Sequence, residues 1–514
     1  MLERSSVAKP ILAPVRTPGM RSITLSLGSN QPFKAALSQS SRSSTLHWRR
    51  TVLLAAAFIS LLTGCQSIEP GEPNTTYGWG PKPLLKPPAP QIIPLVRPAK
   101  AVGWQPGESP TPAEGFAVNA FAKGLDHPRW LYELPNGDIL VAETDAPAPS
   151  SGRGGLLAWF AKRVMRYSGS GYPSADRITL LRDTDQDGIA DLQVPFIENL
   201  HSPFGMALVG STLYVANTDA VVAFPYRNGQ SSIRSTGELI ARLPANAPNS
   251  HWTKNLLAHP NGESLFVAIG SNSNIGELGP VAEQGRAGIW RLDLKTGTLS
   301  PYATGLRNPV GMTWHSPTDT LWTVVNERDQ LGNDLVPDYL AQVNEGDDFG
   351  WPTHYWGILQ DPRVPLDWGS HSTASEKIAH LTGRPTQMPN TDQPKSGASS
   401  IRPRRIPNYA LGAHTASLGL AFYSNPSIPK LKEHAIITQR GSWNRNPPSG
   451  YQVIAVEVTE AGEANDTPKP LLTGFLSENG EAKGRPVGVI VDNRGAILIA
   501  DDVGDTVWYV SRSD

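Results

Sequence analysis

The sequence predicts an all-β fold, a six-bladed β-propeller, from three observations. Glycine, proline and tryptophan are frequent (48, 47 and 14 of 514 residues), and charged residues make up only 18%. This composition favours short strands, many turns and aromatic packing over a helical protein. After Gly115 one unit recurs: a proline or glycine turn, a short apolar strand, a turn, and a strand of β-branched and aromatic residues. Six copies, about 50–75 residues apart, are typical of propeller blades.

The second strands of the copies are the clearest part of the repeat. They are expected at Ile139–Ala142, Leu213–Ala216, Leu265–Ala268, Leu321–Val324, Ala435–Thr438 and Ile497–Ala500. A two-sheet sandwich, the alternative, does not explain six copies of the same unit. The larger gap between the fourth and fifth copies predicts an insertion at about 353–416 on one face.

The N-terminal region has the features of an export signal. Arg49-Arg50 precedes an apolar run, Val52–Leu62, which is too short to span a bilayer. The run ends in Leu-Thr-Gly-Cys65, which resembles a bacterial lipobox, and Cys65 is the one cysteine of the chain. We therefore expect residues 1–65 to be a leader and signal peptide. Acylated Cys65 then anchors the protein to the membrane of a bacterial cell envelope, facing the periplasm; a buried cysteine after a core helix is the alternative.

Residues 66–112 are punctuated by prolines and show no apolar periodicity. We expect an extended tether that shares no core with the propeller, which occupies residues 113–514. The formal net charge of −1 gives no electrostatic reason to expect a nucleic-acid partner.

Asp183, Asp185, Asp187 and Asp191 alternate with other residues around Gly188, as in the first half of an EF-hand loop. Carboxylates at alternate positions converge when such a loop coils, so the pattern predicts a Ca²⁺-binding surface loop in the first or second blade. Position twelve is Val194, so the bidentate glutamate is missing. A polar β-turn without metal is the alternative.

A second polar region follows the fourth copy. The strand that ends at Val325 leads into a loop with Glu327, Asp329 and Asp334, and Arg307 precedes the same blade. Oxygen-rich loops suit a hard cation such as Ca²⁺, and an arginine suits an anionic group. A solvated loop between strands is the alternative.

The chain from about Gly115 to the C-terminus resembles the soluble, pyrroloquinoline-quinone (PQQ)-dependent sugar dehydrogenases, and is most similar to the branch of sorbosone dehydrogenases. The motifs that carry this resemblance are L-R-N-P-x-G at Leu306–Gly311, the acidic loop, and F-G-W-P at Phe349–Pro352. It implies an enzyme that uses PQQ and Ca²⁺ to oxidise a sugar or related aldose and passes the electrons to an acceptor that the sequence does not specify.

The resemblance also implies catalytic roles for two residues. In the family a histidine before this blade's first strand, followed by P-D-G or P-N-G, is the general base, and His251 with Pro260–Gly262 matches it. Arg307 and Asn308 match an Arg-Asn pair at the cofactor. There the arginine holds a quinone carboxylate and polarises the reacting carbonyl, while the amide orients a carbonyl.

Further cofactor contacts follow from the same resemblance. Arg440 and Arg485 match two basic residues that lie against the cofactor. Where relatives have E-x-G-P, whose backbone carbonyls bind Ca²⁺, this chain has E-R-D-Q, which places the ligands on Asp329 and Gln330. The Gly-Pro kink is absent here, and Asp334 is an alternative ligand.

Three further residues are candidates from their type and position. Trp443 is suited to stacking on a planar quinone, although a tryptophan in a Gly-Ser-Trp turn also packs between blades. His201 and His414 precede blade strands, so we expect them at the same rim.

Two other functions are compatible with the sequence. One is a metal-dependent lactonase on the same architecture, which would use carboxylate ligands at the central channel. The other is a non-catalytic propeller that binds a partner or a surface polysaccharide.

Overall fold

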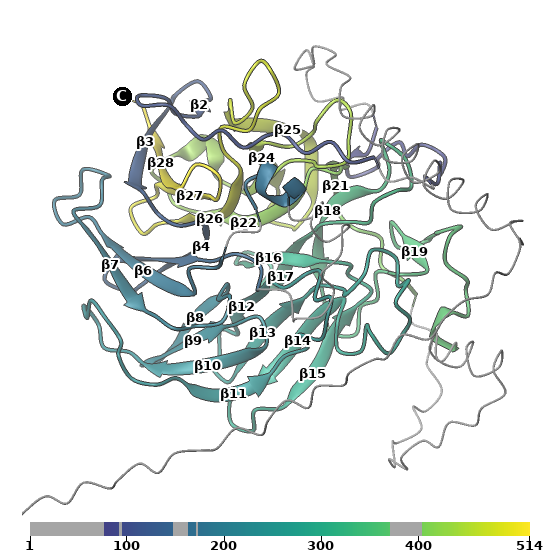
Figure 1. Ribbon diagram of the computed structural model, residues 1–514, viewed down its shortest axis with the longest axis horizontal. Coiled ribbons are helices and arrows are strands. Elements are labelled where there is room, and N and C mark those ends of the chain that lie inside the picture. Colours follow the sequence, from purple (N-terminus) through teal and green to yellow (C-terminus); the bar gives the residue numbers. More distant parts are fainter. Residues whose placement is uncertain (1–76, 92–94, 148–162, 171–172, 371–402, 514) are drawn as a thin grey trace, which may run out of the picture. The chain divides into compact units, whose positions relative to one another are not determined.

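The expected all-β propeller is confirmed. The structure, a computed structural model, describes residues 77–91, 95–147, 163–170, 173–370 and 403–513 (Figure 1). Within these residues the strands form six antiparallel blades of four or five strands. Cys65 and its flanking signal lie outside the described residues.

The first three blades each contain four consecutive strands. The first has β4 (Pro128–Glu133), β5 (Ile139–Glu143), β6 (Arg177–Arg182) and β7 (Leu192–Ile197). The second has β8 (Met206–Val209), β9 (Thr212–Ala216), β10 (Ala220–Pro225) and β11 (Glu238–Arg242). The third has β12 (Lys254–Ala258), β13 (Ser264–Ile269), β14 (Gly288–Asp293) and β15 (Leu299–Thr304).

The other three blades recruit strands from the N-terminal part of the chain. The fourth has β16 (Pro309–His315), β17 (Thr320–Val325), β18 (Pro337–Val343), β21 (Tyr409–Ala413) and β1 (Trp79–Gly80). The fifth has β22 (Ser417–Tyr423), β23 (His434–Gln439), β24 (Gln452–Val458), β25 (Ala464–Thr473) and β2 (Thr111–Pro112). The sixth has β26 (Pro486–Val491), β27 (Ile497–Asp501), β28 (Thr506–Arg512) and β3 (Phe116–Lys123).

Little regular structure lies outside the blades. It consists, in the described residues, of a helical turn at 163–167, a hairpin and two 3₁₀ turns. The hairpin and 3₁₀ turns are β19 (His354–Tyr355), β20 (Leu359–Gln360), η1 (Trp368–Ser370) and η2 (Pro429–Leu431). No helix among the described residues is long and apolar enough to cross a membrane.

The innermost strands of the blades make a closed ring. Each first strand contacts that of the next blade, in the order β4, β8, β12, β16, β22, β26 and back to β4. β28 pairs with β3 to complete the sixth blade, with Thr506 opposite Lys123 and Arg512 opposite Phe116. The two ends of the propeller sequence are therefore joined in one sheet.

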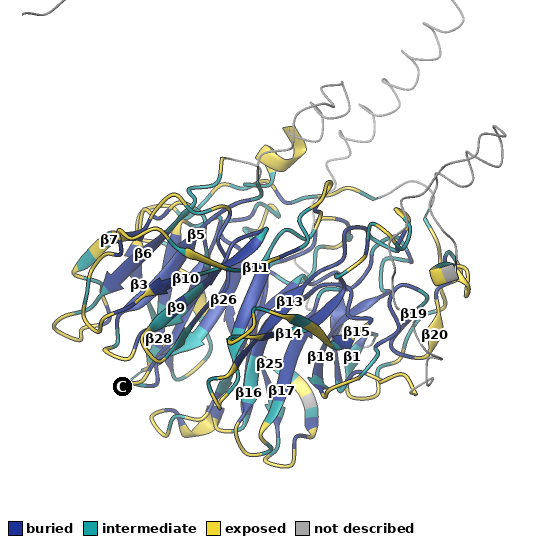
Figure 2. Ribbon diagram, turned by 90° about the horizontal axis from the view of Figure 1, so that it is seen from below, coloured by how far each residue is buried: buried dark blue, intermediate teal, exposed yellow. Residues whose placement is uncertain are grey.

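The hydrophobic core is divided among the interfaces between neighbouring blades. Six clusters of buried apolar side chains occupy these interfaces in the described structure. Both faces of a blade are covered, so second strands such as β5 (Figure 2) and β27 are buried along their whole length. This double burial explains why the second strands form continuous apolar runs in the sequence.

The N-terminal segment differs from the free tether that the sequence predicted. Residues 77–91 and 95–112, which we call the N-terminal strap, pack on the propeller: β1 pairs with β21, and β2 pairs with β25. Ala99 joins the core between the fifth and sixth blades, and Trp104 packs against it. Proline-rich chain forms few ladder hydrogen bonds, but isolated N–H groups such as that of Ala89, which donates to Leu331 O at 2.8 Å, still attach it.

The insertion also differs in extent from the expected range of about 353–416. The excursion begins after β18 and contains the β19–β20 hairpin, but Tyr409–Ala413 forms β21, the fourth strand of the fourth blade. Residues 371–402 lie outside the described residues. The predicted range was too long because all of the sequence between the fourth and fifth copies was assigned to the insertion, although its last part supplies a strand of the fourth blade.

Packing of the strap yields a stability prediction. The Trp104 ring contacts Phe475 and Trp508 at centroid distances of 5.6 and 5.4 Å, and its Nε1 donates to the buried Asp501 carboxylate at 2.7 Å. We expect Trp104→Ala to lower the free energy of unfolding by about 2–4 kcal/mol, as measured by urea titration.

Leu84→Ala is the matched control, because Leu84 lies on the same strap but is 59% exposed. It should change the free energy of unfolding by less than about 0.5 kcal/mol. Equal, small effects of both substitutions would mean that the strap is a free tether after all.

Candidate functional site

Loops from the six blades meet at one end of the central channel. The second strand of each blade runs antiparallel to the first, so residues after the second strand lie beside those before the first. In the fourth blade Asn308 precedes β16 and Asn326 follows β17, and Asn326 N donates to Asn308 O at 3.0 Å. Residues at these two positions in different blades are therefore gathered at the same end.

A cavity of about 420 Å³ lies at this end, and its wall includes five residues predicted from the sequence. They are His251, Arg307, Asp329, Gln330 and Trp443. Trp443 is 43% exposed, although Arg97 N fixes its main chain by donating to its carbonyl at 2.7 Å. Its indole ring is therefore accessible to a molecule in the cavity.

His251 is held in one tautomer. Its Nδ1–H donates to the Ser271 carbonyl at 2.7 Å, so Nε2 carries the lone pair. Burial, and then the positive charge of Arg307, lower the pKa of His251 to about 3. The imidazole is therefore neutral across the physiological range. Gly270 makes room for this arrangement, because a Cβ there would lie 2.2 Å from Asn308 Oδ1 and 2.6 Å from His251 Cβ.

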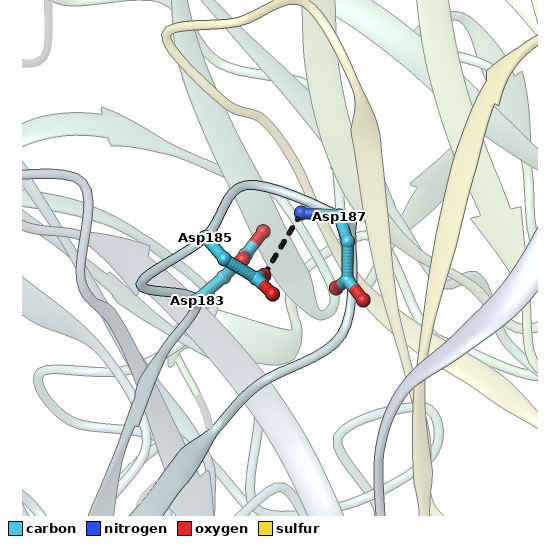
Figure 3. A group of neighbouring side chains, drawn as sticks. All are labelled: Asp183, Asp185 and Asp187. Atoms are coloured by element: carbon cyan, nitrogen blue, oxygen red, sulfur yellow. Dashed lines mark hydrogen bonds between the residues drawn. The ribbon is translucent and has the colours of Figure 1, made fainter.

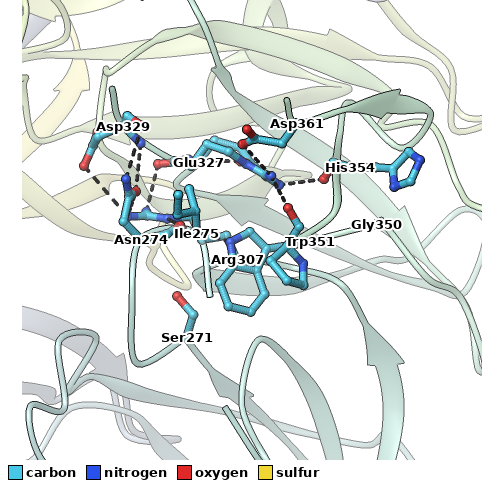
Figure 4. A network of polar contacts seen from close by, with 12 residues as sticks. Ser271, Asn274, Ile275, Arg307, Glu327, Asp329, Gly350, Trp351, His354 and Asp361 are labelled. Atoms are coloured by element: carbon cyan, nitrogen blue, oxygen red, sulfur yellow. Dashed lines mark hydrogen bonds and ion pairs between the residues drawn. The ribbon is translucent and has the colours of Figure 1, made fainter. Parts of the chain in front are cut away.

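Arg307 is a cross-link within the protein rather than the free bidentate clamp that the resemblance implied. Nε donates to Asn274 O at 3.1 Å, Nη2 to Asn274 Oδ1 at 3.0 Å, and Nη1 to Glu327 O at 2.8 Å (Figure 4). Nη1 also donates to Asn326 O at 3.2 Å. Four of the five N–H groups of a guanidinium are thus used. The remaining one lies on Nη2, which is 3.8 Å from the Asp329 carboxylate.

The backbone carbonyls expected to bind Ca²⁺ already accept protein hydrogen bonds. Asp329 O accepts from Arg363 Nη1 at 2.7 Å and from Asn274 Nδ2 at 3.2 Å. Gln330 O accepts from the strap, through Gln91 N at 3.0 Å. The residues present at this position therefore do not fit a metal ion, contrary to the sequence-based expectation.

The alternative ligand Asp334 is also engaged. Its carboxylate lies between Lys86 of the strap and Arg445, whose Nη2 is 2.8 Å from Oδ1. Burial raises the pKa of Asp334, but the hydrogen bonds from Lys86 and Arg445 outweigh it and hold the pKa below its usual value. Asp334 is thus the acceptor of two cationic side chains instead of a metal ligand.

Of the two further histidine candidates, His201 and His414, only His414 has a side chain that contacts the other site residues. His414 is buried, with Nδ1 3.3 Å from Asp329 Oδ1 and Nε2 2.9 Å from Gly332 O. Burial opposes its protonation, but the Asp329 carboxylate outweighs burial and raises the pKa of His414. The His201 backbone lies at the expected end, because Thr218 N, just after β9, donates to its carbonyl at 3.0 Å. Its side chain is 53% exposed, pairs with Asp219 at 3.1 Å and is not part of the described cavity wall.

Arg440 and Arg485 belong to a second charged group, the arginine cluster, which also contains Arg129 and Asp502. Arg440 Nε and Arg129 Nη1 both donate to Asp502 Oδ2, at 2.8 and 2.9 Å. Arg485 is 2% exposed and lies over the Tyr451 ring at 5.1 Å. Burial raises the pKa of Asp502, but Arg440 and Arg129 outweigh it and hold the pKa below its usual value.

The arginine cluster contains buried polar atoms that lack partners. Nε of Arg129, Nε of Arg485 and Oδ1 of Asp502 have no hydrogen-bond partner among the described residues. Asn308 Oδ1, which lies near His251, also lacks a hydrogen-bond partner among the described residues. A buried donor or acceptor left unpaired costs about 1–3 kcal/mol, which makes these atoms candidates for ligand contacts.

The cavity wall and the arginine cluster are connected on both sides of the channel. On one side Trp252, the neighbour of His251, lies under Arg129 at 5.4 Å. On the other side one loop contacts both groups: Arg440, at its start, donates to Asp502, and Asn444 Nδ2, four residues later, donates to Asp329 Oδ1 at 2.7 Å. These contacts link the two groups into one candidate site, although Arg129, Arg440 and Arg485 do not themselves line the cavity.

Several residues of this site were missed by sequence reasoning. Asp502 follows the second strand of the sixth copy, as Asn326 follows that of the fourth, so comparing copies would have found it. Arg129 lies in the turn and strand that open the first copy. Asn274 and Arg363 follow no repeated motif, and nothing in the sequence relates them to Asp329.

The aspartate loop lies in the β6–β7 turn of the first blade, which the strand order places at the opposite end from the site. Carboxylate oxygens of Asp183, Asp185 and Asp187 lie within 4.8 Å of one another, the single such group of three found among the described residues (Figure 3). Asp191 instead accepts from Thr184 N at 2.6 Å, and Arg494 pairs with Asp183 at 2.9 Å. The structure thus gathers three of the four predicted aspartates, and metal binding there stays a prediction.

Comparison with known proteins identifies relatives across most of the propeller. The model of a family described as TrAA12-like matches residues 177–363 and 367–513. An uncharacterized protein of Borreliella burgdorferi is 27% identical over 325 residues, 61% of this chain and 76% of that protein.

Two solved structures share the fold. The iodide structure of the Trichoderma reesei carbohydrate-active enzyme of family AA12 is 18% identical, with a TM-score of 0.57 over 82% of this chain and 100% of that chain. The holo form of the pyranose dehydrogenase PQQ domain from Coprinopsis cinerea is 19% identical, with a TM-score of 0.56 over 80% and 98%.

The burial of His251 predicts a pH-dependent stability. The pKa is about 3 in the folded protein and near 6.5 in an unfolded chain, so unfolding takes up a proton between these values. This contribution to stability is present above pH 6.5 and is lost as the pH falls toward 3. We expect His251→Gln to become more stable relative to wild type as the pH is lowered from neutral to 5, measured by urea titration. A difference between the two proteins that stays constant with pH would contradict the burial of a neutral imidazole.

The aspartate loop gives a metal-removal prediction. If it binds Ca²⁺, chelation should lower the melting temperature of wild type more than that of Asp185→Asn, because a bound ion stabilises only the folded state. Differential scanning fluorimetry with EDTA or Ca²⁺ measures both. Equal shifts in the two proteins would leave this loop without a structural metal.

Proposed function

We propose that this chain, which belongs to the TrAA12-like family, is an oxidoreductase that oxidises a sugar or related aldose with PQQ. Family membership confirms the resemblance to the superfamily of PQQ-dependent sugar dehydrogenases, and the PQQ domain of pyranose dehydrogenase shares the fold. Assignment to the branch of sorbosone dehydrogenases stays a prediction.

The observation that carries this proposal is the arginine cluster. The guanidinium groups of Arg129 and Arg440 donate to the carboxylate of Asp502, and the charge of Arg485 also helps to lower its pKa. Two buried Nε–H groups, of Arg129 and Arg485, have no acceptor in the described protein. PQQ is a planar tricyclic molecule with three carboxylates, so it supplies the negative charges and acceptors that these donors lack. Trp443, exposed on the same loop as Arg440, offers an aromatic face for the rings.

The residues that would hold the cofactor follow from these contacts. Arg129, Arg440 and Arg485 would bind its carboxylates, and Asn308 would direct its unpaired Oδ1 at a donor in the cavity. Arg307 would act mainly by its charge and by holding the Asn326–Glu327 backbone, because few of its N–H groups are available. When bound, PQQ supplies a two-electron acceptor for the oxidation of an alcohol carbon.

His251 is the group that would accept the substrate proton. Ser271 O fixes the N–H on Nδ1, which leaves the Nε2 lone pair as the acceptor for a substrate hydroxyl in the cavity. The low pKa keeps His251 unprotonated at neutral pH, so the base is in its active form before substrate arrives.

No step is assigned to a metal ion at Asp329 and Gln330, because their carbonyls are already hydrogen-bonded. A lactonase would need carboxylate ligands at the central channel. The described acidic cluster lies instead in the β6–β7 turn, at the other end of the blades. No observation therefore favours the lactonase over the oxidoreductase.

Two substitutions separate catalysis from cofactor binding. His251→Gln should lower kcat by at least about 10²-fold, because it removes the proton acceptor, while PQQ affinity changes little. Arg440→Gln should instead weaken PQQ uptake by at least about tenfold, because a charged donor is lost. Turnover with a dye acceptor and a panel of aldoses, beside fluorescence titration of both apoproteins with PQQ, measures the two effects.

Wild-type turnover in His251→Gln would contradict the role of the histidine. Failure of the wild-type apoprotein to take up PQQ under any condition would overturn the proposed function and favour the non-catalytic binding propeller.

A further inference from the structure

The backbone carbonyls of Asp329 and Gln330, at the position where relatives would bind a cation, already accept hydrogen bonds from the protein. Asp329 O has two lone pairs and two donors, Arg363 Nη1 at 2.7 Å and Asn274 Nδ2 at 3.2 Å. The amide of Asn274 is oriented unambiguously, because its Oδ1 accepts from Asp329 N at 2.9 Å and from Arg307 Nη2 at 3.0 Å. A metal ion at Asp329 O would therefore have to displace at least one of these donors.

Arg363 is held rigidly in this place. Its Nε and Nη2 donate to the two carboxylate oxygens of Asp361 at 2.9 and 2.8 Å, a bidentate pair, while Nη1 points to Asp329 O. Asp361 is fully buried and also accepts from Arg328 Nη1 at 3.3 Å. Moving Arg363 aside would leave the charge of Asp361 with a weaker set of partners, which is strongly unfavourable for a buried group.

The charges of the loop are balanced without a metal. Arg328 pairs with Glu327 at 2.9 Å, and Asp329 faces both Arg307 and His414. A divalent cation would enter a region in which every one of these carboxylates already has a cationic partner. It would also stand next to the Arg363 guanidinium, and like charges repel strongly where water is scarce.

We propose that Arg363 replaces the metal ion at the Asp329–Gln330 loop and that the protein takes up PQQ without Ca²⁺. The guanidinium supplies a fixed positive charge and holds the Asp329 carbonyl in place, as a bound cation would. This inference rests on the proposed function, because it concerns how the same cofactor is held.

The test compares PQQ uptake with and without Ca²⁺. Full-length protein carrying Asp185→Asn, which removes a metal ligand from the aspartate loop, is freed of metals and titrated with PQQ in EDTA or in Ca²⁺, with quenching of tryptophan fluorescence as the readout. We expect the two dissociation constants to agree within about threefold, because no metal site is linked to uptake.

Arg363→Met, made in the same background, removes the charge but keeps the length of the side chain. We expect uptake in EDTA to weaken by at least about tenfold and Ca²⁺ to restore it, because Asp329 O becomes available. Arg404→Met is the matched control: the side chain of Arg404 is 38% exposed, its Nε lies 3.8 Å from the half-buried Asp348, and it makes no hydrogen bond to Asp329 or Gln330 among the described residues. It should behave like the parent protein.

Two outcomes overturn the inference, and they are distinguishable. If Ca²⁺ tightens PQQ binding to the parent protein by about tenfold or more, Arg363 does not replace the metal, while the proposed function stands. If PQQ does not bind in either condition, the proposed function fails and the inference falls with it. The comparison in the parent protein does not depend on whether Arg363→Met folds.

Discussion

The pairing of β28 with β3 is the interaction on which the rest of the structure depends. It joins the C-terminal strand to the strand that opens the propeller, over the register from Lys123–Thr506 to Phe116–Arg512. Once the ring is closed, each blade is covered on both faces, and the loops before the first strands and after the second strands share one end. Asp502, just after β27, reaches Arg129 only because the sixth blade closes against the first, while Arg440 comes from the neighbouring fifth blade.

Charge balance then divides the end of the channel into two regions. Around Asp329 each carboxylate meets a cationic side chain, and the backbone carbonyls are hydrogen-bonded, so this region is already complete. In the arginine cluster, in contrast, buried Nε–H groups have no described acceptor. Native proteins rarely leave buried donors unpaired, so the arginine cluster, with its unpaired Nε–H groups, is where an anionic ligand is expected. His251 and the accessible ring of Trp443 lie at the cavity where such a ligand would react.

The blades could be predicted from the sequence because double burial produces continuous apolar strands at regular spacing. His251 and Arg307 could be predicted because their motifs resemble those of a known family, and Trp443 because an aromatic ring suits a planar ligand. The strap could not, because a proline-rich segment attaches through isolated N–H groups that leave no periodic signal. The carbonyls of Asp329 and Gln330 were expected to bind Ca²⁺, but in the structure they accept protein hydrogen bonds. The sequence does not reveal which donors reach a backbone oxygen. Arg363, 34 residues after Asp329, is such a donor.

The central claim is that the arginine cluster is the anion-binding half of a cofactor site. A crystal structure of the protein reconstituted with PQQ tests it most directly. The expected result is cofactor density at the channel end, with carboxylate oxygens within about 3.2 Å of Nε of Arg129 and Arg485 and the rings beside Trp443. Density elsewhere on the propeller, with both Nε–H groups still lacking an acceptor, would contradict the claim.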